Sequence, residues 1–294
     1  MSHSSHRAEG ALAFALRRWR LQRRFRQRCG YAGDFEHPSN YEEKIQFRKL
    51  YGNHARYALV ADKYRVREYV AERAGARYLI PLLGVYDRLT PEVFETLPER
   101  FVIKASHGCK WHRVVWNKAD LDVAATVRYF NRLMGQRYGA KSGEYHYSLI
   151  EPKILIEELL ADGGDSPADY CFDCYHGAQG FECTVAISTP KASAYYDRHW
   201  HLLEGGLPAE LSARLVEPEN YTEMVRVAEA LSRGFDFIRV DLYNVAGRIY
   251  FGELTCTPHA GFTSFDTPVR FRMRTEMWRL DIDNEQLYRK PRTA

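Results

Sequence analysis

The most informative part of this chain consists of two segments, Ile238-Arg239-Val240-Asp241-Leu242-Tyr243 and Ile249-Tyr250-Phe251-Gly252-Glu253-Leu254-Thr255-Cys256-Thr257-Pro258. Both read as apolar strands, and the Asn and Gly of the segment 244–248 between them are typical of a tight hairpin turn. Because side chains alternate along a strand, Arg239, Asp241 and Tyr243 share one face. Glu253, Thr255 and Thr257 share one face of the second strand.

The two strands each carry an acid, Asp241 and Glu253, and in a paired hairpin both lie within reach of one hard cation. A carboxylate among buried strands is costly unless it is paired or bound to a metal. Mg²⁺ is commonly held by one or two carboxylates together with substrate phosphates. The hairpin therefore predicts a magnesium site.

Length and composition favour a globular protein. The chain has 294 residues and is 45% hydrophobic and 14% aromatic, enough for one large domain or two lobes and too apolar for disorder. No apolar run approaches the roughly 20 residues of a membrane span. The run 11–16 is too short for a signal peptide and leads directly into arginines. We therefore expect a cytoplasmic protein.

Positive charge is concentrated at the N-terminus. Residues 1–38 hold eight arginines and three acids, a net charge of +5, whereas the whole chain is +4 and the remainder is near −1. The body is therefore not a basic nucleic-acid binder.

This N-terminal arm has two interpretations. It is either a solvated helix packed by Leu12, Leu16, Trp19 and Phe25, or an interfacial helix whose residues 11–28 touch anionic lipid at the inner membrane face or an acidic glycan.

Six cysteines without a secretion signal are expected to be reduced thiols. Cys171-x-x-Cys174 with Cys183 nearby raises the alternative of a zinc site. Because the segment 169–175 reads as a strand, residues three apart point to opposite faces, and buried thiols are the preferred interpretation.

The remaining pattern alternates helices with antiparallel hairpins. We expect helices from 39 or 40 to 51, from 61 to 73, from 121 to 134 and from 220 to 233, and strands at 79–86, 101–104, 114–116, 154–160, 169–176, 180–188 and 193–197. The loop 162–167 is the predicted hinge or lobe boundary. The fold class is α+β, and the pattern does not suggest an open Rossmann sheet.

Lys104 ends an apolar strand beside a glycine-containing turn. A lysine, a flexible turn and a carboxylate-held metal are the parts that neutralise a triphosphate. The chain also resembles the ATP-grasp proteins, and more narrowly the TupA-like ATP-grasp family of polysaccharide-biosynthesis loci, in the segments 40–46, 61–64, 79–85, 101–108, 169–170, 235–243 and 252–258.

The resemblance implies an ATP-grasp fold, in which two α/β lobes clasp ATP. We expect a basic arm at 1–38, a reduced helical N-terminal region at 39–95, the first lobe at 96–161 and the second lobe, with the metal site, at 162–294.

The resemblance also implies roles for individual residues. Lys63 and Lys104 contact phosphates, and Ser106, His107 and Gly108 begin a flap above them. Glu157, Glu158 and Leu160 belong to the hinge that pairs with adenine, and Asp169, or Glu158 in its place, reaches the ribose. Asp241, Glu253 and Thr255 hold Mg²⁺. Arg239 stabilises charge that develops during the reaction.

Three positions depart from the family pattern. The flap at 108–112 has few small residues, Cys171 stands where a lysine is usual, and Thr255 is a weaker metal ligand than an amide. Lys110 is a candidate replacement for the missing lysine charge.

The expected activity is an ATP- and Mg²⁺-dependent carboxylate–amine ligase acting through an acyl phosphate. Its expected substrates are a uronic-acid carboxylate of a surface polysaccharide and an amino acid. The alternatives are a kinase that phosphorylates a sugar or glycan and a nucleotide-binding protein without turnover.

Overall fold

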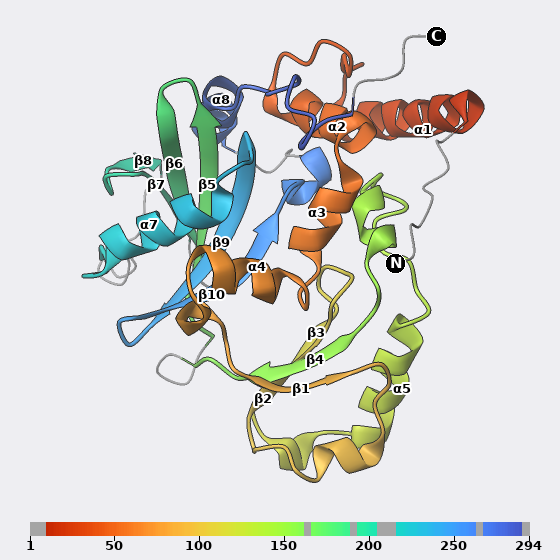
Figure 1. Cartoon of the computed structure of the whole chain (residues 1–294), viewed down its shortest axis with the longest axis vertical. Coiled ribbons are helices and arrows are strands. Elements are labelled where there is room, and N and C mark those ends of the chain that lie inside the picture. The colour runs from red at the N-terminus through yellow and green to blue at the C-terminus, as the bar shows by residue number, and fades with distance from the viewer. Residues whose placement is uncertain (1–9, 162–165, 189–192, 205–215, 263–266, 290–294) are drawn as a thin grey trace.

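Two antiparallel sheets form the framework of the molecule, and helices cover them (Figure 1). The computed structural model describes residues 10–161, 166–188, 193–204, 216–262 and 267–289. The predicted α+β class is confirmed. Within these ranges no helix is both long and apolar enough to cross a bilayer.

The smaller sheet has four strands in the order β1-β4-β2-β3, namely β1 (Leu82–Tyr86), β4 (Ile154–Glu158), β2 (Phe101–Ala105) and β3 (His112–Val115). One face of β2 carries Phe101 and Ile103, which pack with Phe130 of helix α5 (Val123–Leu133). Alternation turns Val102 and Lys104 to the opposite face. One face of this sheet is therefore core, and the other is available to a ligand.

The larger sheet has six strands in the order β10-β9-β5-β6-β7-β8. They are β5 (Asp169–Gly177), β6 (Gly180–Ser188), β7 (Ser193–Asp197), β8 (Leu202–Glu204), β9 (Phe237–Val245) and β10 (Arg248–Thr255). Phe172 packs with Met224 of helix α7 (Tyr221–Ser232), whereas Tyr175 faces Trp278, which follows helix α8 (Pro268–Met277). Helices therefore cover both faces of this sheet.

The N-terminal helices are part of the larger lobe. Helix α2 (Tyr41–Tyr51) packs on the α8 side of the sheet. Helices α3 (His54–Ala61) and α4 (Val66–Arg73) pack with α7 on the other side. Strand β1, which the expected region 39–95 included, pairs with β4 in the smaller sheet. Residues 39–95 are therefore divided between the two sheets.

The predicted helix at 61–73 is wrong in its first turn, because Ala61 ends α3 and the next helix begins at Val66. Between them the Asp62 carboxylate accepts hydrogen bonds from the backbone N–H groups of Tyr64, at 2.9 Å, and Arg65, at 3.4 Å. Such a side-chain turn competes with helical hydrogen bonding. It directs Lys63 toward the smaller sheet, where its N–H donates to the Ser106 carbonyl.

The N-terminal arm forms helix α1 (Ala11–Cys29), but its predicted packing is wrong for three of four residues. Phe25 is buried with Leu21, whereas Leu12, Trp19 and Leu16 are 85%, 56% and 44% exposed. The side of the helix that carries Leu12, Leu16 and Trp19 therefore faces outward.

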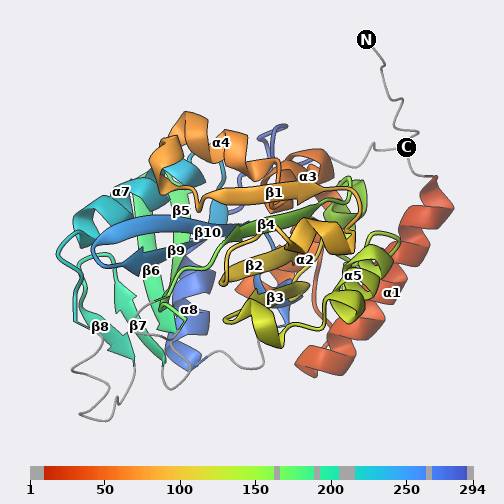
Figure 2. The same cartoon turned by 90° about the horizontal axis from the view of Figure 1, so that it is seen from below.

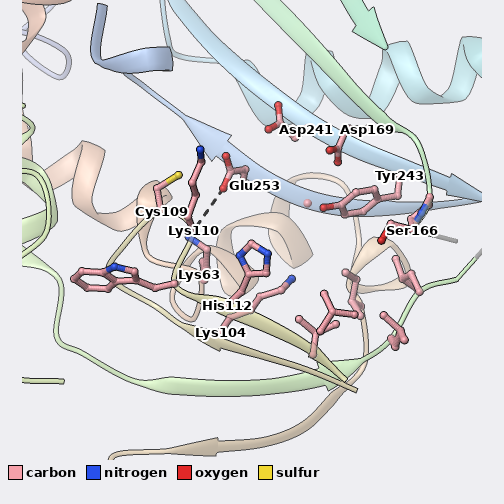
Figure 3. A pocket seen from close by; sticks show the side chains of 18 of the residues that line it. Lys63, Lys104, Cys109, Lys110, His112, Ser166, Asp169, Asp241, Tyr243 and Glu253 are labelled. Atoms are coloured by element: carbon pink, nitrogen blue, oxygen red, sulfur yellow. Dashed lines mark ion pairs between the residues drawn. The ribbon is translucent and has the colours of Figure 1, made fainter. Parts of the chain in front are cut away.

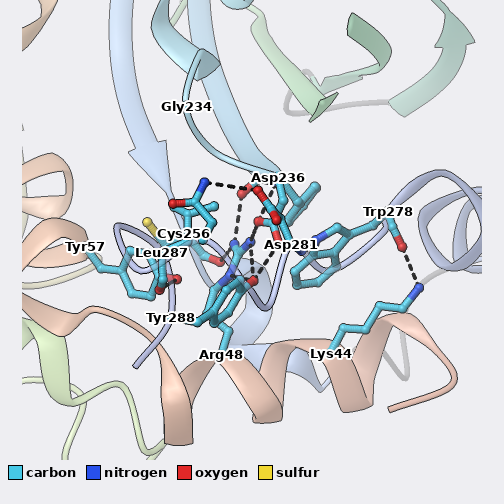
Figure 4. A network of polar contacts seen from close by, with 12 residues as sticks. Lys44, Arg48, Tyr57, Gly234, Asp236, Cys256, Trp278, Asp281, Leu287 and Tyr288 are labelled. Atoms are coloured by element: carbon cyan, nitrogen blue, oxygen red, sulfur yellow. Dashed lines mark hydrogen bonds and ion pairs between the residues drawn. The ribbon is translucent and has the colours of Figure 1, made fainter. Parts of the chain in front are cut away.

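Helix α2 is tied to the ends of β9 and β10 by the fully buried Arg48 (Figure 4). Its guanidinium donates to the carbonyls of Phe237, at 2.9 Å, and Cys256, at 2.8 Å, and to the carboxylate of Asp236. The Tyr288 hydroxyl also donates to Asp236, at 2.7 Å. Because no charge in this network faces water, each partner compensates the burial of the others.

We expect Asp236→Ala to destabilise the protein by about 3 kcal/mol or more, because it leaves the Arg48 charge buried and uncompensated. Urea unfolding followed by circular dichroism measures the change. Arg233→Ala, which removes an exposed pair with Glu229, is the control and should leave the urea midpoint unchanged. Equal midpoints for the two variants would contradict the role of this network.

Candidate functional site

A cavity of about 460 Å³ lies between the two sheets (Figure 3). The β2–β3 hairpin and the segment after β4 line it on one side, and β5, β9 and β10 line it on the other. Its walls include predicted site residues from both lobes, namely Lys63, Lys104, Glu158, Leu160, Asp169, Arg239, Asp241 and Glu253. Residues separated by up to 190 positions in sequence are thus brought to one place.

A β-bulge places the two acids opposite each other. Phe251 pairs with Leu242, but the next pair is Glu253 with Asp241, and Gly252 is the extra residue. In regular register Gly252 would face Asp241, and Glu253 would share the core face with Val240. The bulge therefore turns the Glu253 side chain into the cavity.

Arg239 joins the two carboxylates. Its guanidinium donates to both oxygens of Asp241, at 2.7 and 2.6 Å, and to Glu253 Oε1, at 3.1 Å. Thr255 donates to the same oxygen of Glu253, at 3.1 Å, and does not line the cavity. Thr255 thus orients Glu253, and its predicted role as a metal ligand stays a prediction.

The two carboxylates have different acidities. Burial raises the pKa of Asp241 to about 6, with Arg239 opposing the rise and Glu253 adding to it. Burial also acts on Glu253, but Lys63 and Arg239 more than offset it and hold its pKa below the ordinary value. At neutral pH both groups are therefore mainly ionised.

The donors of this acidic pair suit a hard cation. Within the described ranges, no group of three or more His, Cys, Asp or Glu side chains is arranged around a metal position. The protein thus offers two carboxylates, which is the number that Mg²⁺ needs when phosphate oxygens and water complete its shell. The residues present fit the predicted ion.

Two lysines approach the acids (Figure 3): Lys104 from β2 of the smaller sheet, and Lys63 from the turn between α3 and α4. Lys63 Nζ lies 4.0 Å from Glu253 and donates to the Gly108 carbonyl at 2.8 Å. Lys104 Nζ is held 2.7 Å from Glu157, which also pairs with Arg67 at 3.0 Å. Both ammonium groups are fixed by partners that leave part of each side chain exposed to the cavity.

The predicted flap contributes different residues from those expected. Ser106 is buried, and its hydroxyl accepts the N–H of Lys153, at 3.0 Å. His107 is also buried, with Nε2 3.1 Å from the Leu133 carbonyl. Neither these two residues nor Gly108 lines the cavity, whereas the next four, Cys109, Lys110, Trp111 and His112, do. The part of the flap that lines the cavity therefore begins at Cys109, three residues after the predicted start at Ser106.

The hinge segment is divided in a similar way. Glu158, Leu159 and Leu160 line the cavity, whereas Glu157 points to Lys104 and Arg67. Of the predicted boundary loop, residues 162–165 lie outside the described residues, and Ser166 and Pro167 line the cavity.

Sequence reasoning missed Ile80, Val102 and Val114, which form the apolar part of the wall together with Leu159 and Pro167 of the predicted hinge segments. Strand alternation could have found two of these residues. Val102 lies two positions from Lys104, and Val114 pairs with Val102 across the hairpin. The cavity therefore has an apolar end and a charged end.

The alternative of a zinc site at Cys171 and Cys174 is wrong, because the two side chains lie on opposite faces of β5. Cys171 lines the cavity beside Asp241, its partner on the neighbouring strand β9. Cys174 is buried with Cys183 in the core on the other face of the sheet. All six cysteines are free. Burial raises the pKa of Cys171 far above the ordinary value, so this thiol stays protonated.

We expect Cys174, Cys183 and Cys256 to react with a thiol reagent only after denaturation, because all three are buried. Thiol titration with and without guanidinium measures this, and elemental analysis should find no stoichiometric zinc. The variant Cys174→Ala should lower only the denatured count, by one. A bound zinc whose removal exposes these thiols would contradict the assignment.

Comparison with known proteins gives the family. The TupA-like ATPgrasp family matches residues 43–271, a span that includes every strand of both sheets. No curated protein is similar to the chain at a significant level.

Solved structures are similar to the chain at low identity. An L-amino acid ligase from Bacillus licheniformis is 13% identical, with a TM-score of 0.45 over 72% of this chain and 46% of its own. A D-alanine–D-alanine ligase from Helicobacter pylori is 14% identical, with a TM-score of 0.43, and the match covers 75% of this chain and 59% of the ligase. An ADP complex of N5-carboxyaminoimidazole ribonucleotide synthetase is 13% identical, with a TM-score of 0.40, and the match covers 67% of this chain and 45% of the synthetase. The chain spans about half the length of these proteins. On the family match, the chain belongs to the TupA-like ATP-grasp family and has the ATP-grasp fold.

Proposed function

We propose that this chain is an ATP- and Mg²⁺-dependent ligase that joins a carboxylate to an amine through an acyl phosphate. The observation that carries the proposal is the convergence of Asp241, Glu253, Lys63 and Lys104 at the charged end of one cavity. Acids for a metal and cations for phosphates are the components of phosphoryl transfer.

The cavity has a suitable place for each part of ATP. The adenine occupies the apolar end, between Val102 and Leu160, where the backbone of 158–160 supplies polar groups. Asp169 lines the same cavity and would reach the ribose. The phosphates lie between Lys63 and Lys104, and Lys110 of the flap approaches the same position.

Asp241 and Glu253 would hold Mg²⁺, which neutralises phosphate charge when bound. Arg239 is already fixed by both acids, so its guanidinium needs no reorganisation as negative charge develops on the transferring group. Glu157 positions Lys104 and does not itself touch the nucleotide.

The reaction balances in two displacements. A carboxylate oxygen attacks the γ-phosphorus, the bond to the bridging oxygen of ADP breaks, and an acyl phosphate forms. An amine then attacks the acyl carbon, phosphate leaves with the bonding electrons, and the amine loses a proton. Because the first nucleophile is already an anion, the protein contributes mainly positioning and charge neutralisation.

The resemblance suggests a uronic acid of a surface polysaccharide as the carboxylate and an amino acid as the amine. The six free cysteines support a reducing compartment such as the cytoplasm.

Incubation with ATP, Mg²⁺, a uronic-acid glycan and an amino-acid mixture, followed by mass spectrometry, tests the proposal. Amide products formed together with ADP support the ligase. A phosphorylated glycan would overturn it in favour of a kinase, and nucleotide binding without ADP would show a binding protein without turnover.

We expect Glu253→Gln to abolish ADP formation, because it removes one of the two anionic oxygen donors for the metal. ADP release is measured at saturating Mg²⁺. The control is Glu182→Gln, which alters an exposed pair with Arg198 in the same sheet and should retain full activity. Unchanged turnover by Glu253→Gln would refute the metal assignment.

Gly252→Ala tests the bulge itself. An added Cβ would lie 3.0 Å from the Asp241 carbonyl oxygen and 3.2 Å from Tyr243, so β10 must shift away from β9. We expect the dissociation constant of Mg·ADP, measured by calorimetry, to rise by about tenfold or more, since small displacements in such sites are costly. Gly177→Ala is the control, because nothing lies within 4 Å of its added Cβ. Equal affinities of the two variants for Mg·ADP would show that nucleotide binding does not depend on the bulge.

A further inference from the structure

Helix α1 presents an exposed stripe of apolar and basic side chains. Leu12, Leu16, Trp19, Arg23 and Arg26 recur at the spacing that places residues on one face of a helix. All five are exposed, and the three apolar members are 85%, 44% and 56% exposed. The stripe extends over about 21 Å at 1.5 Å per residue.

The opposite face fixes the helix to the body, so the stripe cannot turn inward. Leu21 and Phe25 are buried against Phe35, Leu50 and Phe262. The side chains of Arg17 and Arg24 donate to the carbonyls of Leu50, at 3.0 Å, and Lys141, at 2.6 Å. Figures 1 and 2 show α1 along the outer edge of the molecule.

The charge of this helix points to an anionic partner. Residues 11–29 contain seven arginines and no acid. Arg20, Arg23 and Arg26 are exposed beside the apolar side chains, and the Arg23 guanidinium lies over the Trp19 ring at 5.8 Å. A polar polyanion such as a nucleic acid or an acidic glycan would engage the arginines and leave Leu12, Leu16 and Trp19 in water.

We propose that α1 is a membrane-surface helix that binds the headgroup region of an anionic bilayer. Leucine and tryptophan enter the boundary between headgroups and acyl chains, and the arginines lie at the level of the lipid phosphates. Each basic side chain near such a surface strengthens binding by roughly fivefold. With three apolar anchors the attachment is reversible and sensitive to salt. An enzyme held in this way would meet lipid-linked substrates at the surface.

Co-sedimentation of the full chain with phosphatidylcholine vesicles, with and without phosphatidylglycerol, tests this proposal without nucleotide or substrate. We expect binding only to the anionic vesicles. The variant Leu12→Ser/Leu16→Ser/Trp19→Ser should abolish it. The variant Arg20→Gln/Arg23→Gln/Arg26→Gln should weaken it by on the order of a hundredfold.

The matched control is Arg88→Gln/Arg100→Gln/Arg226→Gln, which removes three exposed arginines from the body. It should bind vesicles as well as the parent chain. A second readout is a blue shift of tryptophan emission on vesicle addition, which Trp19→Phe should remove while binding persists.

Three results would overturn the proposal. One is vesicle binding that the apolar variant leaves intact. Another is binding to a soluble uronic-acid polymer in place of vesicles, which would make the partner a glycan. The third is a dimer in solution that the apolar variant dissociates, which would make the partner a second copy. None depends on turnover, so each is distinguishable from failure of the proposed ligase activity.

Discussion

The pairing of Asp241 with Glu253 across β9 and β10 is the constraint on which the site depends. Asp241 is buried and Glu253 is partly buried, so the two acids repel each other and lose hydration, and the arrangement needs cations close by. Arg239 supplies one in the same sheet, and Lys63 supplies another from the segment between α3 and α4. The folded chain thus holds a charge cluster in which Arg239 and Lys63 compensate the two acids.

The rest of the fold keeps this cluster in place. Arg48 is bonded to the carbonyls that flank β9 and β10, so α2 fixes the ends of both strands. The Asp62 turn ends α3 where Lys63 can reach the smaller sheet. The two lobes therefore meet through charged residues whose backbones are tied to rigid elements, as a preorganised electrostatic site requires.

Much of the architecture could be predicted from sequence, because it rests on local patterns. Alternation identified the strands at 169–176 and 180–188 and placed Cys171 and Cys174 on opposite faces. The start of α2 was expected at Ser39 or Asn40, and Asn40 is the cap, because its side chain accepts the Glu43 N–H at 3.1 Å. The proximity of Asp241 and Glu253 was also expected. In a regular two-residue hairpin, however, their side chains would lie on opposite faces of the sheet.

The features that were missed depend on tertiary contacts or on turn geometry. The hairpin turns at Ala246 and Gly247, both with positive φ, whereas Asn244 belongs to β9 and bonds Asn220. The bulge at Gly252 has no local signal beyond the glycine itself. One interpretation of α1 packed Leu12, Leu16, Trp19 and Phe25 against the body, but only Phe25 is buried there, together with Leu21. Amphipathic spacing identifies a face and not its partner.

The most direct test of the central claim is a crystal structure grown with ADP and Mn²⁺, in which the anomalous signal locates the metal. We expect a peak bound by carboxylate oxygens of both Asp241 and Glu253 and by a phosphate oxygen of ADP. A peak away from this pair, or nucleotide bound elsewhere than between Lys63 and Lys104, would contradict the central claim.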